Sequence, residues 1–133
     1  MKFLVLVGRI LFSLIFLFTI PGHFSSQMIG YAASQGVPAP AVLVPLSGVI
    51  AFAGGLSIMF GYKARLGAWL IVLFLVPVTF WMHAFWKIAD PMARQMDTAM
   101  FMKNVALTGG ALLIAYFGAG PWSVDEKNVQ KRR

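Results

Sequence analysis

The sequence predicts an all-α membrane protein, a bundle of four transmembrane helices that forms a single domain over residues 1–133. Hydrophobic residues make up 59% of the chain and charged residues 11%, whereas soluble globular domains carry about 25% charged residues. A chain of 133 residues is too short to bury so much apolar surface in one core. The lipid bilayer is therefore the first partner that the sequence implies.

Four apolar stretches come close to the length of about 20 residues that a helix needs to cross a bilayer. They cover residues 3–20, 41–60, 66–85 and 99–117. Proline and glycine punctuate their ends, as in Pro21-Gly22 after the first stretch. Pro77 lies inside the third stretch and is expected to kink it, because proline removes a backbone hydrogen bond.

The first stretch is expected to stay in the protein as a spanning helix. A secretory signal has an apolar region of about 7–15 residues and a cleavage site of small residues. The run over residues 3–20 is longer, and Pro21-Gly22-His23 follows it.

The links between the stretches carry further helix signals. In residues 21–40, Ser25 or Ser26 is placed to cap a short helix that reaches Gln35. This link has no acid, lysine or arginine, so the short helix is expected to lie in the outer membrane interface. In the third link, Asp90-Pro91 is a strong helix start.

Two further features concern charged residues near helix ends. Asp90 and Arg94 are spaced for an ion pair along the fourth helix. Residues 119–133 form a predicted cytoplasmic tail, which is expected to be frayed from Asp125 onward. Ser123 and Glu126 have capping-box spacing, but little chain follows them.

The basic residues predict the orientation. With four spans, both termini and the second link lie on one side of the membrane, with eight basic residues on that side and three on the other. The first group contains Lys2, Arg9, Lys63, Arg65, Lys127, Lys131, Arg132 and Arg133, and the second contains Lys87, Arg94 and Lys103. The excess places both termini in the cytoplasm. The same distribution explains the net charge of +7 without nucleic acid as a partner.

Polar residues gather at the predicted outer ends of the helices. The candidates for a ligand site are His23, His83, Trp86, Lys87, Lys103 and Asn104. Histidine can pass protons near neutral pH, and Lys103 and Asn104 can hold a carbonyl or an anion, so a quinone head suits this cluster. The alternative is an interfacial anchor layer with structural hydrogen bonds.

On the inner side, Arg9 is the candidate polar residue. One interpretation is snorkelling, with hydrogen bonds to carbonyls at the ends of the second and fourth spanning helices. The other is a site for an anionic head group, a lipid or a quinone oxygen. No acid lies within the apolar stretches to pair with it.

Several kinds of chemistry have no signature in the sequence. The chain has no cysteine, which excludes thiolate nucleophiles and thiolate metal ligands. No nucleophile–base arrangement or metal-ligand motif occurs, so we assign no catalytic residue and no metal. Small residues are spaced for helix packing at Ser47, Ala51 and Gly55, at Ala106 and Gly110, and at Ala111 and Ala115.

Six segments of the chain form a recognisable set: LVGRILFSLIFLF, YAASQGVPAP, GVIAFAGGLSIMFGYKARLGAW, HAFW at 83–86, FMKNVALTGGALL and GAGPWSVD. Together they resemble the DoxX family of small bacterial membrane proteins. The resemblance implies a four-helix bundle in the bacterial inner membrane. Some relatives are linked to quinone-coupled sulfur oxidation or to redox-stress defence. The family often has Glu before the Gly-Gly pair, where this sequence has Ala51, which argues against proton-linked chemistry here.

Three functions follow as hypotheses. The first is a subunit or accessory of a membrane redox system that contacts quinone, with oxidoreductase-associated activity if the protein is an enzyme. No other cofactor is evident. The second is a non-catalytic structural subunit that packs against a membrane partner or another copy of itself. The third is a passage for a small solute or ion.

Overall fold

The computed structural model describes residues 1–131 and confirms the all-α membrane fold. Four helices are long and apolar enough to cross a membrane: α1 (Lys2–Phe18), α3 (Pro40–Phe60), α4 (Ala64–Met82) and α5 (Pro91–Phe117). The shorter elements are η1 (Ile20–Phe24), α2 (Ser26–Ser34), η2 (Phe85–Lys87) and α6 (Val124–Gln130). Arg132 and Arg133, counted in the charge distribution, lie outside the described residues.

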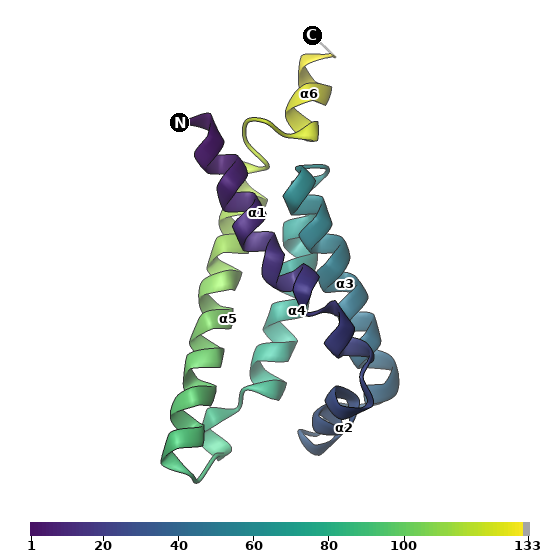
Figure 1. Ribbon diagram of the computed structural model, residues 1–133, viewed down its shortest axis with the longest axis vertical. Helices are drawn as coiled ribbons and strands as arrows, with labels where there is room; N and C mark the ends of the chain where they lie inside the picture. The colour runs from purple at the N-terminus through teal and green to yellow at the C-terminus, as the bar shows by residue number, and fades with distance from the viewer. Residues whose placement is uncertain (132–133) are drawn as a thin grey trace.

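The long helices pack in a sequential order, α1 on α3, α3 on α4, and α4 on α5. Both chain ends lie at one end of the bundle, and α2 lies at the other (Figure 1). We call these the terminal end and the distal end. The common position of the two termini agrees with four spans, and its cytoplasmic location stays a prediction from the charges.

The core is built around small residues of α3 and apolar side chains of its neighbours. Ala51 is buried beside Phe16 of α1 and Ile71 of α4. A side chain at Gly54 would meet the Gly67 carbonyl oxygen of α4, whereas one at Gly55 would meet α1. The Gly-Gly pair therefore serves two helix contacts at once, one on each side of α3.

Two predicted helix caps are confirmed. The Ser25 hydroxyl accepts a hydrogen bond from the Met28 backbone N–H at 3.1 Å and starts α2. The Asp90 carboxylate accepts one from the Ala93 N–H at 2.8 Å and starts α5.

The predicted ion pair between Asp90 and Arg94 does not form. The Arg94 guanidinium donates instead to the carbonyl oxygens of Ile88, at 2.8 Å, and Ala89, at 3.3 Å. The Asp90 carboxylate is already used as the cap of α5. Backbone carbonyls at the end of the preceding link thus compete successfully for the guanidinium.

The tail is folded through α6, so the expectation of fraying from Asp125 was wrong for the described part. Ser123 accepts a hydrogen bond from the Glu126 N–H at 3.1 Å, and the Glu126 carboxylate accepts one from the Trp122 N–H at 2.8 Å. The Asp125 carboxylate accepts two more from the start of α4. These contacts across the chain hold a helix that its short length alone would not stabilise.

Candidate ligand-binding site

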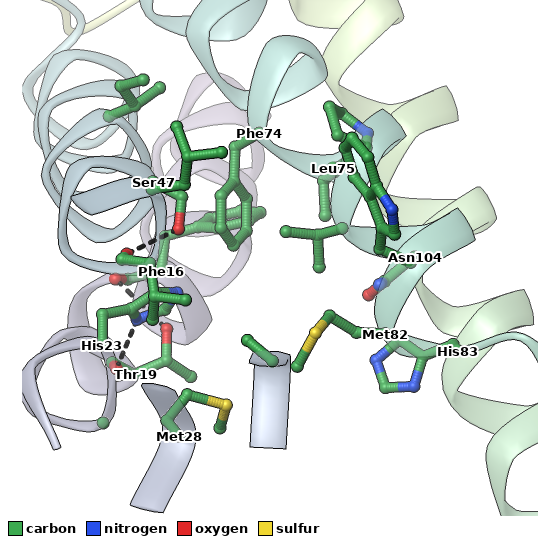
Figure 2. Close-up of a pocket in the computed structure, with 18 of the residues that line it drawn as sticks. Phe16, Thr19, His23, Met28, Ser47, Phe74, Leu75, Met82, His83 and Asn104 are labelled. Atoms are coloured by element: carbon green, nitrogen blue, oxygen red, sulfur yellow. Dashed lines mark hydrogen bonds between the residues drawn. The ribbon is translucent and has the colours of Figure 1, made fainter. Parts of the chain in front are cut away.

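A cavity of about 740 Å³ lies at the distal end of the bundle. Its walls come from the end of α1, η1, α2 and the first half of α3 on one side, and from the second half of α4 and the middle of α5 on the other. Most lining side chains are apolar, among them Phe74, Leu75 and Met82 (Figure 2). The volume falls within the range of about 300–1,000 Å³ that is typical of ligand sites.

His23 forms part of the first wall because a short 3₁₀ helix follows α1. Its Cβ lies against Gly48 of α3, where any added side-chain carbon would come within 2.5 Å of it. The imidazole packs on the Phe74 ring, with the ring centroids 5.6 Å apart. Its Nδ1 is 3.0 Å from the Thr19 carbonyl oxygen. The ring is thus fixed on three sides.

His83 stands at the end of α4 and lines the opposite side of the cavity (Figure 2). Its Nδ1 lies 2.8 Å from a carboxylate oxygen of Asp97, and the two side chains are 22% and 16% exposed. The Asp97 contact is the one pairing of an acid with a basic side chain within residues 1–131. It ties the end of α4 to α5 and orients the imidazole.

Asp90 and Asp97 are the acids that the sequence predicts at this end of the bundle, but neither is one of the six candidate ligand residues. A signal was present, since Asp97 precedes Asn104 by seven residues and therefore lies on the same face of the helix. The fold brings His83 and Asp97 together only through the turn between α4 and α5, which the spacing does not specify.

Asn104 and Lys103 bring polar groups from α5. Asn104 is only 4% exposed, yet its amide makes no hydrogen bond with any group in the described part of the chain. Figure 2 shows this amide directed into the space opposite His23. The amide is not among the side-chain atoms of the described residues that are fully enclosed without a partner, so it is open to the cavity and can bond to water or a ligand there. Lys103, the preceding residue, is exposed and also lines the cavity.

Two other candidates lie outside the cavity lining. Trp86 is half-exposed and contacts the Phe101 ring edgewise, with centroids 6.0 Å apart. Lys87 is exposed at the end of η2. The structure thus gathers His23, His83, Lys103 and Asn104 around one cavity and leaves these two beside it.

Arg9 lies at the terminal end, far along α1 from the cavity, and is 4% exposed. Its two terminal nitrogens donate to the carbonyl oxygens of Ala119 and Trp122, each at 2.7 Å. These carbonyls follow α5, so the expected contact with the end of the fourth spanning helix forms. At the end of α3, Gly61 instead makes room for the guanidinium, because any Cβ there would lie 2.6 Å from it. The contacts support the snorkelling interpretation.

Comparisons with known proteins agree with this architecture. The DoxX family model matches residues 4–84. The inner membrane protein YqjF of Escherichia coli K12 is 34% identical over 125 residues, which cover 91% of this chain and 88% of YqjF. YphA, another E. coli K12 inner membrane protein, is 29% identical, with 93% and 89% covered.

A eukaryotic protein also matches. The Surfeit locus protein 4 homolog of Schizosaccharomyces pombe is 30% identical over 92% of this chain, which spans 36% of that protein's length. No solved structure matches the sequence. With four helices able to span a membrane and relatives that are inner membrane proteins, this chain is a multi-pass inner-membrane protein that belongs to the DoxX family.

Proposed function

We propose that the protein binds a quinone-type molecule in the distal cavity and acts as a subunit or accessory of a membrane redox system. The single observation that supports this most is the Asn104 amide, which belongs to a residue that is only 4% exposed and faces an apolar cavity (Figure 2). An isoprenoid or alkyl tail would occupy the apolar part of the cavity, and ring oxygens would meet the polar groups.

The four polar residues provide complementary hydrogen-bonding groups for such a ring. Lys103 has only donors, and Asn104 has both a donor and an acceptor. His23 and His83 each have one ring nitrogen engaged by the protein, at 3.0 Å and 2.8 Å, which leaves the other for a ligand. Polar groups on both sides of an apolar space are what an amphipathic ring molecule requires.

The chain offers no cysteine for electron transfer, so we propose that a partner membrane protein exchanges electrons with the bound molecule. The alternative of a purely structural subunit rested on the small-residue spacing. In the structure, Ala51 and Ala111 are buried in the chain's own core, and Gly55 lies against α1. These three residues therefore already form helix contacts within the same chain, and they do not favour a contact with a partner protein.

A passage for solutes has less support. The cavity lining does not extend into the terminal half of the bundle, where Ile58 and Ala68 are fully buried. At the terminal end, Arg9 is bound to backbone carbonyls of the α5–α6 link.

Quinone binding to the purified protein in lipid nanodiscs tests the proposal. A benzoquinone with a decyl tail should bind and quench the fluorescence of Trp81, which lines the cavity. Lys103→Ala should weaken binding by about tenfold or more, because a hydrogen bond to a charged group contributes about 1.5–3 kcal/mol. Lys87→Ala is the matched control, because it removes a lysine from the same end outside the cavity.

Redox spectroscopy on the protein purified with its native membrane partners gives a second readout. If no quinone binds to the protein alone or with copurified partners, and no redox signal appears, the proposed function is wrong. Binding that Lys87→Ala and Lys103→Ala weaken equally would place the ligand elsewhere.

A further inference from the structure

We infer that the distal cavity selects the reduced, dihydroxy form of its ligand over the quinone form, and that Asp97 is the positioning residue that sets this preference. This inference rests on the proposed function. It follows from the hydrogen-bonding state of the two histidines that line the cavity.

Asp97 determines where His83 carries its proton. An ionised carboxylate can only accept hydrogen bonds, so His83 Nδ1, 2.8 Å from the Asp97 oxygen, must carry a hydrogen. In a neutral imidazole the other nitrogen, Nε2, then has a lone pair and no hydrogen. Asp97 thereby makes the free nitrogen of His83 a hydrogen-bond acceptor.

His23 is held in the same state by a different group. Its Nδ1 lies 3.0 Å from the Thr19 carbonyl oxygen, which also can only accept. Within residues 1–131 no group bonds to Nε2 of either histidine. The two histidines lie on opposite sides of the cavity (Figure 2), so an acceptor is present on each side.

The ligand that matches these acceptors must have hydroxyl groups. A hydroxyl can donate to an imidazole lone pair and can also accept from the Lys103 ammonium or the Asn104 amide. A quinone carbonyl can only accept, so it satisfies the α5 donors but places its lone pairs against those of a neutral histidine. Reduction of the quinone creates hydroxyl groups that can donate to histidine. The affinity of the cavity for the quinol should therefore exceed its affinity for the quinone by about two- to tenfold, the value of one hydrogen bond.

The test compares the two redox forms of one molecule. Dissociation constants are measured in nanodiscs, without oxygen, for a decyl-tailed benzoquinone and its quinol. The measurements are made at about pH 8.5, above the range in which histidine side chains usually gain charge. We expect the wild-type protein to bind the quinol about two- to tenfold more tightly.

Asp97→Asn separates positioning from a general structural role. The amide of Asn can donate to His83 Nδ1, which allows the ring hydrogen to move to Nε2 and turns the cavity-facing nitrogen into a donor. The quinol preference should then disappear or reverse. The matched control is Asp90→Asn at the start of the same helix, since Asn caps a helix as well as Asp does. The ratio of its quinone and quinol dissociation constants should equal that of the wild type.

His83→Gln provides a second variant if Asp97→Asn does not fold, because its amide can present either a donor or an acceptor, and it should also abolish the preference. Equal or tighter binding of the quinone by the wild type would overturn the inference while leaving quinone binding in place. An unchanged ratio of the quinone and quinol dissociation constants in Asp97→Asn or His83→Gln would overturn the inference as well. Failure of both redox forms to bind would instead refute the proposed function itself.

Discussion

At the scale of single residues, Arg9 shows how a membrane helix accommodates a buried cation whose direct partners are backbone carbonyls and not a carboxylate. Its guanidinium is almost fully buried, and two short hydrogen bonds to the Ala119 and Trp122 carbonyls compensate for lost hydration. Its Nε has no partner in the described residues. The carbonyls belong to the segment between α5 and α6, so Arg9 joins the first spanning helix to the end of the chain.

Arg9→Lys should lower the free energy of unfolding by about 2 kcal/mol. An ammonium lacks the planar, forked geometry with which the guanidinium reaches two carbonyls, and a hydrogen bond to a charged group contributes about 1.5–3 kcal/mol. Reversible unfolding in detergent measures the difference. Arg94→Lys is the control, since Arg94 also donates to two carbonyls but is exposed. Equal losses in the two variants would contradict the structural role of Arg9.

Part of this residue-level picture could be predicted. A charged residue inside an apolar run must find polar partners, so contacts of Arg9 with carbonyls at the ends of the second and fourth spanning helices were predicted. The contacts at the end of the fourth helix form, with Ala119 and Trp122, whereas no carbonyl of the second spanning helix is a partner. The Asp97–His83 contact was not foreseen, because it depends on how the η2 segment turns between two helices. Sequence spacing describes faces of one helix well and the angle between two helices poorly.

At the scale of elements, the closest helix crossing joins α3 and α4. The Gly54 and Gly67 backbones meet there, since an added Cβ on Gly54 would lie 2.8 Å from the Gly67 carbonyl oxygen. A Cβ on Gly67 would lie 3.0 Å from the Gly54 oxygen. Contact of this kind between backbones gains van der Waals energy that larger side chains prevent.

Gly54→Ala should therefore destabilise the protein by about 1–3 kcal/mol, the usual cost of overpacking a core. Gly109→Ala is the matched control in α5, where nothing lies within 4 Å of an added Cβ. This control should be neutral or stabilising by up to about 1 kcal/mol, because alanine favours the helix. Thermal unfolding in detergent compares the pair, and a larger loss for Gly109→Ala would exclude the observed α3–α4 crossing.

The start of α4 depends on a residue from the far end of the sequence. Lys63 occupies the N-cap of α4 and supplies no side-chain cap. The Asp125 carboxylate of α6 replaces it, accepting from the Lys63 N–H at 2.8 Å and the Ala64 N–H at 3.0 Å. The Asp125 N–H in turn donates to the Gly61 carbonyl at 2.8 Å. The tail thus closes the α3–α4 turn.

Asp125→Ala should expose this turn and cost about 1 kcal/mol, the usual value of a helix cap. Amide hydrogen exchange at Lys63 and Ala64 should become faster, and the tail should become more sensitive to protease. Lys127→Ala, an exposed change in the same helix, should alter neither property. Unchanged exchange at Lys63 and Ala64 in the Asp125 variant would show that this cap does not form in solution.

The helix starts at Ser25 and Asp90 could be predicted because each cap and the helix it starts are adjacent in the sequence. The fold of the tail could not be predicted from the sequence, because the start of α4, which stabilises the tail, lies about 60 residues away along the chain. Local patterns therefore predicted fraying where a long-range carboxylate contact produces a short helix.

At the scale of the whole molecule, the two ends differ in charge and in packing. The terminal end contains the basic residues Lys2, Arg9, Lys63, Arg65, Lys127 and Lys131 of the described chain, and the distal end contains Lys87, Arg94 and Lys103. The cavity lies only at the distal end. If the positive-inside rule holds, the cavity therefore faces the outer leaflet, and any quinone there would exchange protons with the outer side of the membrane.

Cysteine labelling in spheroplasts tests this orientation, because the chain has no native cysteine to give a background. Ser34→Cys, exposed on α2 at the distal end, should react with a membrane-impermeant maleimide in intact spheroplasts. Val129→Cys, 55% exposed on α6 at the terminal end, should react only after permeabilisation. Each variant is the control for the other. The reverse pattern would place the termini outside, and the charge asymmetry would then need a cause other than insertion by the positive-inside rule.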